Sequence, residues 1–403
     1  MNLIFLTMSN LTSVDTHGIY SDLMRKFHNK GHEVYIVSPR ERRTGEKTHL
    51  YELSGVHILG VKTLNLQKSN VVEKGIGQVL VESQFTNAIK RYLGDVKFDL
   101  ILYSTPPITF LNVIQHLKSA NPSATAYLLL KDIFPQNAVD LGMMTKTGLK
   151  SVLYRYFRNK EKKLYALSDF IGCMSPANVR YVVEHNPEVC PDKVELAPNS
   201  YEKNEQVVLS KEELRTIREK YSLPTDRPIF IYGGNLGKPQ SVPFLIQCFE
   251  ANANRRNCHF VVVGSGTEYT KLESWYNTRS PQNVSVFQCL PKDDYDQLVR
   301  VCDVGLIFLD YRFSVPNYPS RLLPYLMEKK PVIVASDPNC DMGAIAEQNG
   351  YGYWCPSNDT EAFSQCVDKM LASALRQMGE NGYRYYLDNY TVEHTFNAII
   401  KHC

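Results

Sequence analysis

Residues 228–240 read PIFIYGGNLGKPQ, and this stretch decides the fold. Its apolar first half predicts a strand that is buried on both faces. Two adjacent glycines end the strand, and a helical pattern begins at about Val242. A strand that passes through a glycine-rich turn into a helix is typical of a parallel α/β sheet.

The same alternation of strand and helix runs along most of the chain. A helix is expected from about Gly18 to Asn29, with Gly31 closing it as the C-cap. Strands are expected at residues 2–8, 32–38, 98–104, 125–131, 169–175, 193–198, 228–234, 258–264, 284–290, 304–310 and 330–336. The pattern predicts doubly wound α/β sheets.

A length of 403 residues suits two domains rather than one. Residues 200–226 are polar and charged and contain no expected strand, so the domain boundary is placed there. We expect Rossmann-like domains at 1–200 and 201–385, followed by a C-terminal helix at 386–403. Ligands bind beyond the carboxyl ends of such strands, so a cleft between two facing sheets is the expected site.

Charge and composition exclude several classes of protein. The net charge is only +3 and no nucleic-acid-binding motif occurs, which argues against a nucleic-acid partner. No apolar run approaches the length of a bilayer span, and Met1–Leu6 predicts a strand rather than a signal peptide. Ten scattered cysteines without metal-ligand spacing indicate reduced thiols in a cytoplasmic protein.

The turn after the strand at 228–234 is the first candidate site. Glycines such as Gly234 let the backbone approach a phosphate closely, and Asn235 and Lys238 add a polar and a positive group. The P-loop spacing is absent. The alternative is an ordinary turn that needs glycine for its backbone dihedrals.

Two further turns in this half follow expected strands. Ser320 is predicted to cap a helix over 322–328, and Arg321 is suited to forked contacts with phosphate oxygens. Gly264 and Gly266 are expected to border a base or ribose. A plain cap with a surface arginine, and a plain turn, are the alternatives.

In the first half, Asp132 directly follows the strand at 125–131. It is a candidate to orient an acceptor hydroxyl or take its proton, and the alternative is a cap of a turn. Thr16, His17 and Gly18 follow the first strand and are expected to face the cleft. The alternative for His17 is a solvated loop histidine.

The sequence Asp294-Tyr295-Asp296 has the spacing of a metal-binding D-x-D motif. It lies at the start of a helical pattern, where acidic side chains favour the helix dipole. We therefore interpret the acids as part of a helix start and expect no metal.

Residues 146–163 form a basic amphipathic stretch. Its charged residues are Lys146, Lys150, Arg155, Arg158, Lys160, Lys162 and Lys163 against Glu161. Its apolar residues follow helical spacing at Leu149, Val152, Leu153, Tyr156, Phe157 and Leu164. Such a helix is suited to an anionic membrane surface. A surface helix that packs its apolar stripe on the first domain is the alternative.

With these motifs in place, the chain resembles glycosyltransferase family 4, and most closely its WbuB-like branch, which builds capsule, exopolysaccharide and O-antigen repeats. The matching segments are 31–34 (GHEV), 132–136 (DIFPQ, for the family's DLWPE), 196–199 (LAPN, for IPNG), 234–238 (GNLGK) and 263–266 (VGSG, for VGxG). Their order and spacing cover nearly the whole chain.

The resemblance implies a GT-B fold and an enzyme of class EC 2.4 without cofactor or metal. It implies retaining transfer of a hexosyl or N-acetylhexosaminyl group from a UDP-sugar to a lipid-linked glycan at the cytoplasmic face of the membrane. Asn235, Lys238, Ser320 and Arg321 would contact donor phosphates. The last helix, around Thr391–Lys401, would cross back to the first domain.

One departure from the family concerns two glutamates that it carries eight positions apart. Pro316 and Pro324 stand at those positions, and Glu328 is a candidate substitute one turn beyond. Pro324 also predicts a kink in its helix. A catalytically inactive homologue that serves as a partner subunit or sugar-binding protein is the alternative function. A sugar-nucleotide epimerase of the same architecture is disfavoured, because the expected cleft has few acidic and histidine groups.

Overall fold

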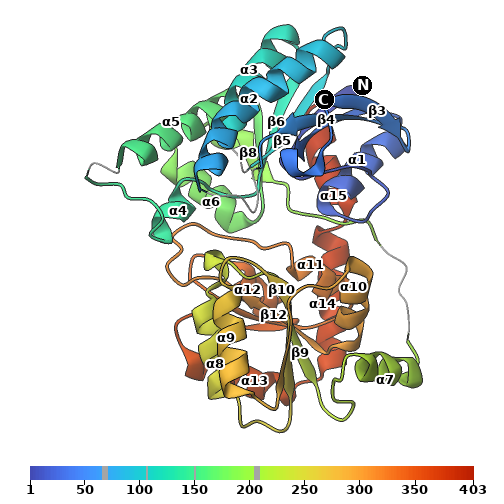
Figure 1. Ribbon diagram of the computed structural model, residues 1–403, viewed down its shortest axis with the longest axis vertical. Helices are drawn as coiled ribbons and strands as arrows, with labels where there is room; N and C mark the ends of the chain where they lie inside the picture. The colour runs from blue at the N-terminus through green and yellow to red at the C-terminus, as the bar shows by residue number, and fades with distance from the viewer. Residues whose placement is uncertain (66–70, 106–107, 149–150, 204–208) are drawn as a thin grey trace. The chain divides into compact units, whose positions relative to one another are not determined.

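The computed structural model describes residues 1–65, 71–105, 108–148, 151–203 and 209–403. The chain forms two compact units (Figure 1). Unit 1 comprises Met1–Glu202 and Tyr390–Cys403, and unit 2 comprises Lys203–Asn389. The first boundary lies inside the polar segment 200–226, and the second follows Asn389 rather than residue 385.

Unit 1 is built on a sheet with the strand order β3-β4-β2-β1-β5-β6-β7-β8. Its strands are β1 (Asn2–Leu6), β2 (Glu33–Glu41), β3 (His49–Leu53), β4 (Val56–Thr63), β5 (Leu100–Ser104), β6 (Thr125–Leu130), β7 (Phe170–Cys173) and β8 (Val194–Leu196). From β1, the chain first winds outward through β2 and β4 and then, on the other side, through β5 to β8. This is a doubly wound sheet, as predicted.

The β3–β4 hairpin was not predicted. These two strands pair antiparallel, so the sheet is not wholly parallel. Ser54 and Gly55 connect them with φ angles of +54° and +75°, the mirror-image turn that suits the twist of a two-residue hairpin. The hairpin extends one edge of the sheet and lies away from its centre.

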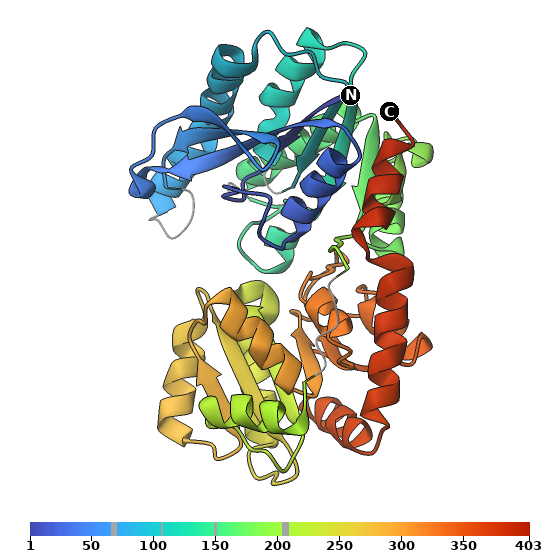
Figure 2. The same cartoon turned by 90° about the vertical axis from the view of Figure 1, so that its right-hand side faces the viewer.

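The helices of unit 1 are α1 (Ile19–Asn29), α2 (Val71–Leu93), α3 (Leu111–Ala120), α4 (Gln136–Asp140), α5 (Ser151–Leu167), α6 (Pro176–His185) and α15 (Val392–Ile400). α15 packs against α1 through Phe396, whose ring centroid lies 4.8 Å from that of Phe27. The two chain ends therefore lie in the same unit (Figure 2). Lys30, rather than the predicted Gly31, is the C-cap of α1. Gly31 follows it directly and adopts φ +84°.

Unit 2 has a parallel sheet with the order β11-β10-β9-β12-β13-β14. Its strands are β9 (Ile229–Asn235), β10 (His259–Ser265), β11 (Val284–Phe287), β12 (Val304–Phe308), β13 (Val332–Ser336) and β14 (Gly352–Pro356). This is the 3-2-1-4-5-6 order of dinucleotide-binding sheets. The edge strand β14 was not predicted, because a glycine and a proline bound its short apolar segment.

The helices of unit 2 are α7 (Lys211–Lys220), α8 (Val242–Ala251), α9 (Tyr269–Arg279), α10 (Lys292–Val301), α11 (Leu322–Met327), α12 (Met342–Gln348), α13 (Thr360–Leu371) and α14 (Leu375–Asn389). α11 begins only at Leu322, so Pro324 lies in its first turn. N–H groups there have no intrahelical acceptor, so the proline costs no hydrogen bond. The predicted kink is therefore wrong. In the described part of the chain, no helix combines the length and apolarity that a bilayer span requires.

Candidate functional site

The centre of the unit 2 sheet is the point from which the chain winds in two directions. β9 and β12 are neighbours there, and each continues outward on its own side. Ligands of doubly wound sheets bind beyond the carboxyl ends of the strands at this point. The loop after β12 reaches the loop after β9, since the Asp310 N–H donates to the Pro239 carbonyl at 2.9 Å. Two of the predicted segments thus meet at one edge.

The two glycine-rich turns pack directly on each other. Gly264 pairs in register with Gly234, and a Cβ at Gly264 would lie 2.0 Å from the Gly234 carbonyl oxygen. A Cβ at Gly266 would lie 2.4 Å from the Leu236 carbonyl oxygen. The Leu236 N–H donates to Ser265 at 2.9 Å. The two turns therefore pack backbone against backbone. Gly264 is buried between them, whereas Gly234 and Gly266 are exposed and form a backbone surface.

Arg321 lies beside this surface. Its guanidinium carbon is 4.4 Å from the ring centroid of Tyr232 and 3.6 Å from the place of a Cβ on Gly234. The Nη1 atom of Arg321 is buried and has no hydrogen-bond partner. A buried donor without a partner is costly, and an anionic oxygen would remove that cost. Stacking on the Tyr232 ring fixes the position of the Arg321 guanidinium group, so that it can bind such an oxygen.

Lys238 opens a short 3-10 turn, Lys238–Gln240, and its side chain is exposed. Gln240 Oε1 accepts hydrogen bonds from Asn235 Nδ2 at 3.0 Å and from the Gly237 N–H at 3.2 Å. Gln240 therefore shapes the loop. Within the described residues, no hydrogen bond or ion pair engages the Lys238 ammonium, so its charge is available.

The structure corrects the role of Ser320. Arg321, not Ser320, occupies the N-cap position of α11, and no side chain caps that helix. Ser320 contributes its carbonyl, which accepts the Leu323 N–H at 3.0 Å. The helix begins at Leu322, as predicted, so its N-cap position falls on Arg321, and Ser320 lies one residue before that position. A contact between Ser320 and phosphate stays a prediction.

The acids of the D-x-D sequence pair with basic side chains. Asp294 lies in the first turn of α10, as expected, and accepts from Lys220 at 2.8 Å and from the Tyr221 hydroxyl at 2.9 Å. Asp296 pairs with Lys292 at 2.6 Å. Throughout the part of the chain that the structure describes, no cluster of His, Cys, Asp and Glu could hold a metal ion.

Glu328, the candidate substitute for the missing glutamates, directly follows α11 as its C-cap residue. Its carboxylate accepts from Arg300 Nε at 3.0 Å. One of its oxygens is therefore committed to a salt bridge with α10.

In unit 1, Asp132 follows β6 at the carboxyl edge of the sheet. The Thr105 hydroxyl, at the end of β5, accepts the Lys131 N–H at 3.0 Å and donates to the Asp132 carbonyl at 3.3 Å. Burial raises the pKa of Asp132 to about 7 and lowers the pKa of Lys131 to about 7. A carboxyl group with a pKa near 7 is suited to proton transfer at neutral pH.

His17 is not simply solvated. Its Nδ1 lies 2.8 Å from the Asp22 carboxylate, and its ring lies 4.7 Å from that of Tyr201. Asp22 is buried and also accepts the N–H groups of Gly18, at 3.0 Å, and of Glu202, at 2.8 Å. Burial acts to raise the pKa of Asp22, but these hydrogen bonds outweigh it and lower the pKa.

Sequence analysis did not identify Asp22. It stands four residues after Gly18, and its carboxylate accepts the Gly18 N–H at the start of α1. The three residues of the predicted loop contact differ in exposure. Thr16 is exposed, whereas His17 and Gly18 are half-buried in the hydrogen-bonded start of the helix.

Residues 151–163 of the basic stretch lie in α5, and only part of the apolar stripe is buried. Leu164 is buried, and Phe157 meets Phe134 edge to face at 5.1 Å between ring centroids. The exposed apolar side chains are Met143 at 62%, Val152 at 61%, Leu153 at 52% and Tyr156 at 51%. Val152, Leu153 and Tyr156 lie on α5, and we call these three residues the α5 apolar patch. Leu149 and Lys150 lie outside the described residues.

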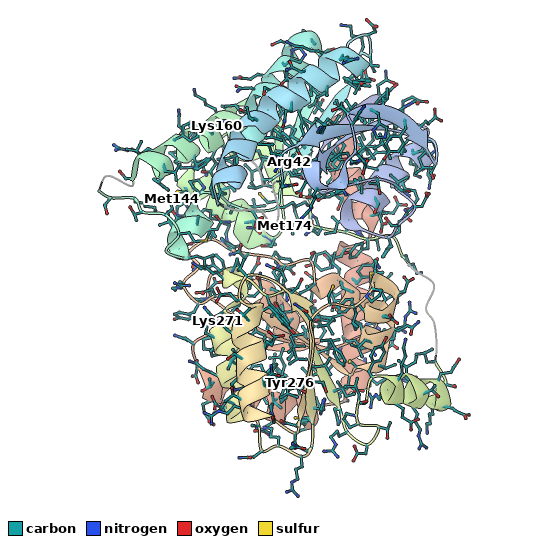
Figure 3. All side chains as sticks on the ribbon, viewed as in Figure 1. Arg42, Met144, Lys160, Met174, Lys271 and Tyr276 are labelled. Carbon is teal, nitrogen blue, oxygen red and sulfur yellow. The ribbon has the colours of Figure 1, made fainter. Side chains whose placement is uncertain are left out.

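Some of the basic side chains near the patch are paired. Lys160 contacts Glu82 at 3.0 Å, and Lys162 contacts Glu188 at 3.0 Å. Arg155 and Lys163 are exposed, and no ion pair involves them among the described residues. Figure 3 labels Lys160 on α5 and Met144 in the segment before it. Exposed apolar groups and unpaired positive charges thus occur together on this helix.

Comparison with known proteins supports this architecture. Residues 214–385 match the family model of glycosyl transferases group 1, so unit 2 carries a domain of that type. The chain is 22% identical over 317 residues to the "Probable glycosyltransferase WbjE" of Pseudomonas aeruginosa, which is 77% of this chain and 75% of the relative.

Two solved structures have the same fold. One is a sucrose-phosphate synthase from Thermosynechococcus elongatus, with a TM-score of 0.77, 15% identity, and coverage of 99% of this chain and 97% of the other. The second is Anabaena HepE in complex with UDP, with a TM-score of 0.69, 11% identity, and coverage of 100% and 99%. The predicted GT-B class, with two α/β parallel-sheet units, is confirmed. The WbuB-like branch stays a prediction.

The raised pKa of Asp132 has a measurable consequence for stability. Its folded-state pKa of about 7 exceeds the usual 3.8, so its contribution to stability is complete below about pH 4 and is lost as the pH rises through 7. Asp132→Asn removes this titration. We expect the stability of the variant relative to wild type to increase from pH 5 to pH 8 in urea unfolding.

Asp192→Asn, at an exposed position of the same unit, is the matched control. A difference between Asp132→Asn and wild type that stays constant across this pH range would contradict the assignment.

Proposed function

We propose that this protein is a retaining glycosyltransferase that moves a hexosyl or N-acetylhexosaminyl group from a UDP-sugar to a lipid-linked glycan in cell-surface polysaccharide biosynthesis. Unit 2 binds the donor, and unit 1 binds the acceptor. The observation that carries the proposal is the pair of cations Lys238 and Arg321, which form no ion pair among the described residues and lie beside the exposed backbone of Gly234.

A diphosphate matches this site in charge and in shape. It brings oxygens that can accept from Arg321 Nη1, and its negative charge balances two positive side chains. Gly234 is exposed and, having no side chain, lets a phosphate approach its backbone beside Arg321. HepE, which shares the fold, has been solved in complex with UDP. The motif resemblance to polysaccharide-building enzymes supports the acceptor class.

The chemistry follows from where charge develops. The bond between the anomeric carbon and the β-phosphate oxygen breaks, and negative charge accumulates on the departing UDP. Lys238 and Arg321 stabilise that charge. The acceptor hydroxyl oxygen bonds to the anomeric carbon on the same face, and its proton passes to Asp132, whose pKa lies near neutrality.

For the acceptor side, we propose that Thr16, His17 and Gly18 contact the glycan and that the α5 apolar patch rests on the cytoplasmic face of an anionic membrane. Apolar side chains and a tyrosine beside basic residues are the composition of an interfacial helix. Each basic residue near an anionic surface contributes about 1 kcal/mol of attraction. A lipid-linked acceptor would be presented at that surface.

Nucleotide binding tests the donor site. We expect UDP to raise the melting temperature, because a ligand at about 100 times its dissociation constant adds about 2.7 kcal/mol to the stability of the folded state. Lys238→Ala and Arg321→Ala should each weaken binding roughly ten- to a hundredfold, since hydrogen bonds to charged groups contribute about 1.5–3 kcal/mol. Calorimetric titration with UDP measures both effects.

Arg256→Ala, at an exposed position just before β10 and therefore at the opposite edge of the sheet from the glycine turns, removes one positive charge and should leave the affinity unchanged. If UDP, GDP, ADP and CMP all fail to bind wild type, the donor site is refuted. In that case Pro316 and Pro324 favour the inactive-homologue function instead.

Vesicle binding tests the membrane contact. Val152→Glu combined with Leu153→Glu places two negative charges in the α5 apolar patch. We expect co-sedimentation with vesicles containing anionic phospholipid to fall at least tenfold, because apolar contact is lost and charge repulsion is added. Neutral phosphatidylcholine vesicles should bind weakly in every case.

Leu53→Glu, at a residue of unit 1 that is 41% exposed, is the control for adding charge at an exposed apolar position. Equal binding of the double variant and wild type to anionic vesicles would refute this part of the proposal.

A further inference from the structure

The crevice between β9 and β12 is filled by a tyrosine. β12 pairs with β9 only at Phe230 and Ile231, and the two strands separate beyond that point. The Tyr325 hydroxyl takes the place of the missing strand partner. It accepts the Gly233 N–H at 3.0 Å and donates to the Ile231 carbonyl at 3.1 Å. The backbone immediately before Gly234 is thereby held by a side chain of α11.

The fit of Tyr325 depends on a second glycine. A Cβ at Gly305 on β12 would lie 2.3 Å from the Tyr325 ring, so only glycine admits the ring at this position. Tyr325 is fully buried. It also follows Pro324 directly, so the helix that lacks the family's second glutamate places a phenol at the switch point instead.

Tyr295, the middle residue of the D-x-D sequence, joins this arrangement. Its hydroxyl would lie 2.0 Å from a Cβ on Gly233, so the Tyr295 side chain packs against the same backbone segment that Tyr325 binds. The acids on either side of it face other partners, Lys220 and Lys292. In this motif, the contact with the glycine turn therefore belongs to the tyrosine and not to the acids.

We infer that Tyr325 and Tyr295 are positioning residues for a diphosphate ligand. They set the orientation of the Gly233–Gly234 backbone, against which Arg321 and the ligand oxygens must lie. This inference rests on the proposed donor site in unit 2. The two phenols act through the backbone and do not themselves contact the ligand.

A positioning role predicts a loss of phosphate affinity rather than a loss of folding. Tyr325→Phe keeps the ring in its glycine-lined slot but leaves the Gly233 N–H and the Ile231 carbonyl without this partner. We expect about a tenfold loss of affinity for UDP and for inorganic pyrophosphate alike. Tyr295→Phe, which retains the Tyr325 bonds, should lose about threefold.

The experiment is calorimetric titration of the full chain with UDP and with pyrophosphate. It is paired with hydrogen exchange at the Gly233 amide, which should become faster in Tyr325→Phe. The control is Tyr353→Phe in β14, which removes a hydroxyl that lies 2.8 Å from Ser373 Oγ in the same unit. It should change neither affinity nor exchange at Gly233, whatever its effect on the melting temperature.

Each outcome separates the inference from the proposed function. If wild type binds UDP and Lys238→Ala weakens that binding, while both tyrosine variants bind as wild type does, the positioning role is overturned and the donor site stands. If Tyr325→Phe fails to fold, Tyr295→Phe decides, and unchanged affinity overturns the inference. If wild type binds neither UDP nor pyrophosphate, the donor site and the positioning role fall together.

Discussion

The contact between the Gly234 and Gly264 backbones is the constraint on which the proposed donor site depends. With any side chain at residue 264, β9 and β10 could not end in register, because its Cβ would overlap the Gly234 carbonyl. The close approach buries Gly264 and leaves the exposed backbone surface of Gly234 and Gly266 at the point where the chain winds in two directions. Arg321 and Lys238 are candidate phosphate ligands because they lie beside that surface.

The two units use their carboxyl edges in different ways. In unit 2, Lys238 and Arg321 lie at this edge without an ion-pair partner among the described residues. The Tyr232 ring stacks on Arg321, and Gln240 hydrogen bonds to the loop that carries Lys238. In unit 1, burial brings the pKa values of Asp132 and Lys131 towards neutrality from opposite directions. A site that stabilises a leaving anion and a site that exchanges a proton are the two requirements of group transfer to a hydroxyl.

Much of this could be predicted from local sequence, because apolar runs and glycine turns mark buried strands and their ends. The glycine turns and Asp132 were found in that way. The remaining features of the candidate site depend on tertiary packing. The stacking of Arg321 on Tyr232 and the insertion of Tyr325 depend on how α11 meets β9, which no local pattern encodes. The cap at Ser320 failed by one residue, within the usual uncertainty of helix ends. The basic stretch is helical as predicted, but local sequence does not decide which of its apolar residues are buried, and Val152, Leu153 and Tyr156 are exposed.

Hydrogen exchange of the full chain with and without saturating UDP tests the central claim most directly. The account predicts slower exchange in three segments of unit 2, residues 233–238, 264–268 and 320–323, because a diphosphate would cover the backbone where these turns meet. Exchange elsewhere in unit 2, including β14, should change little. Unchanged exchange in all three segments at saturating UDP, or protection confined to unit 1, would contradict the assignment of the donor site.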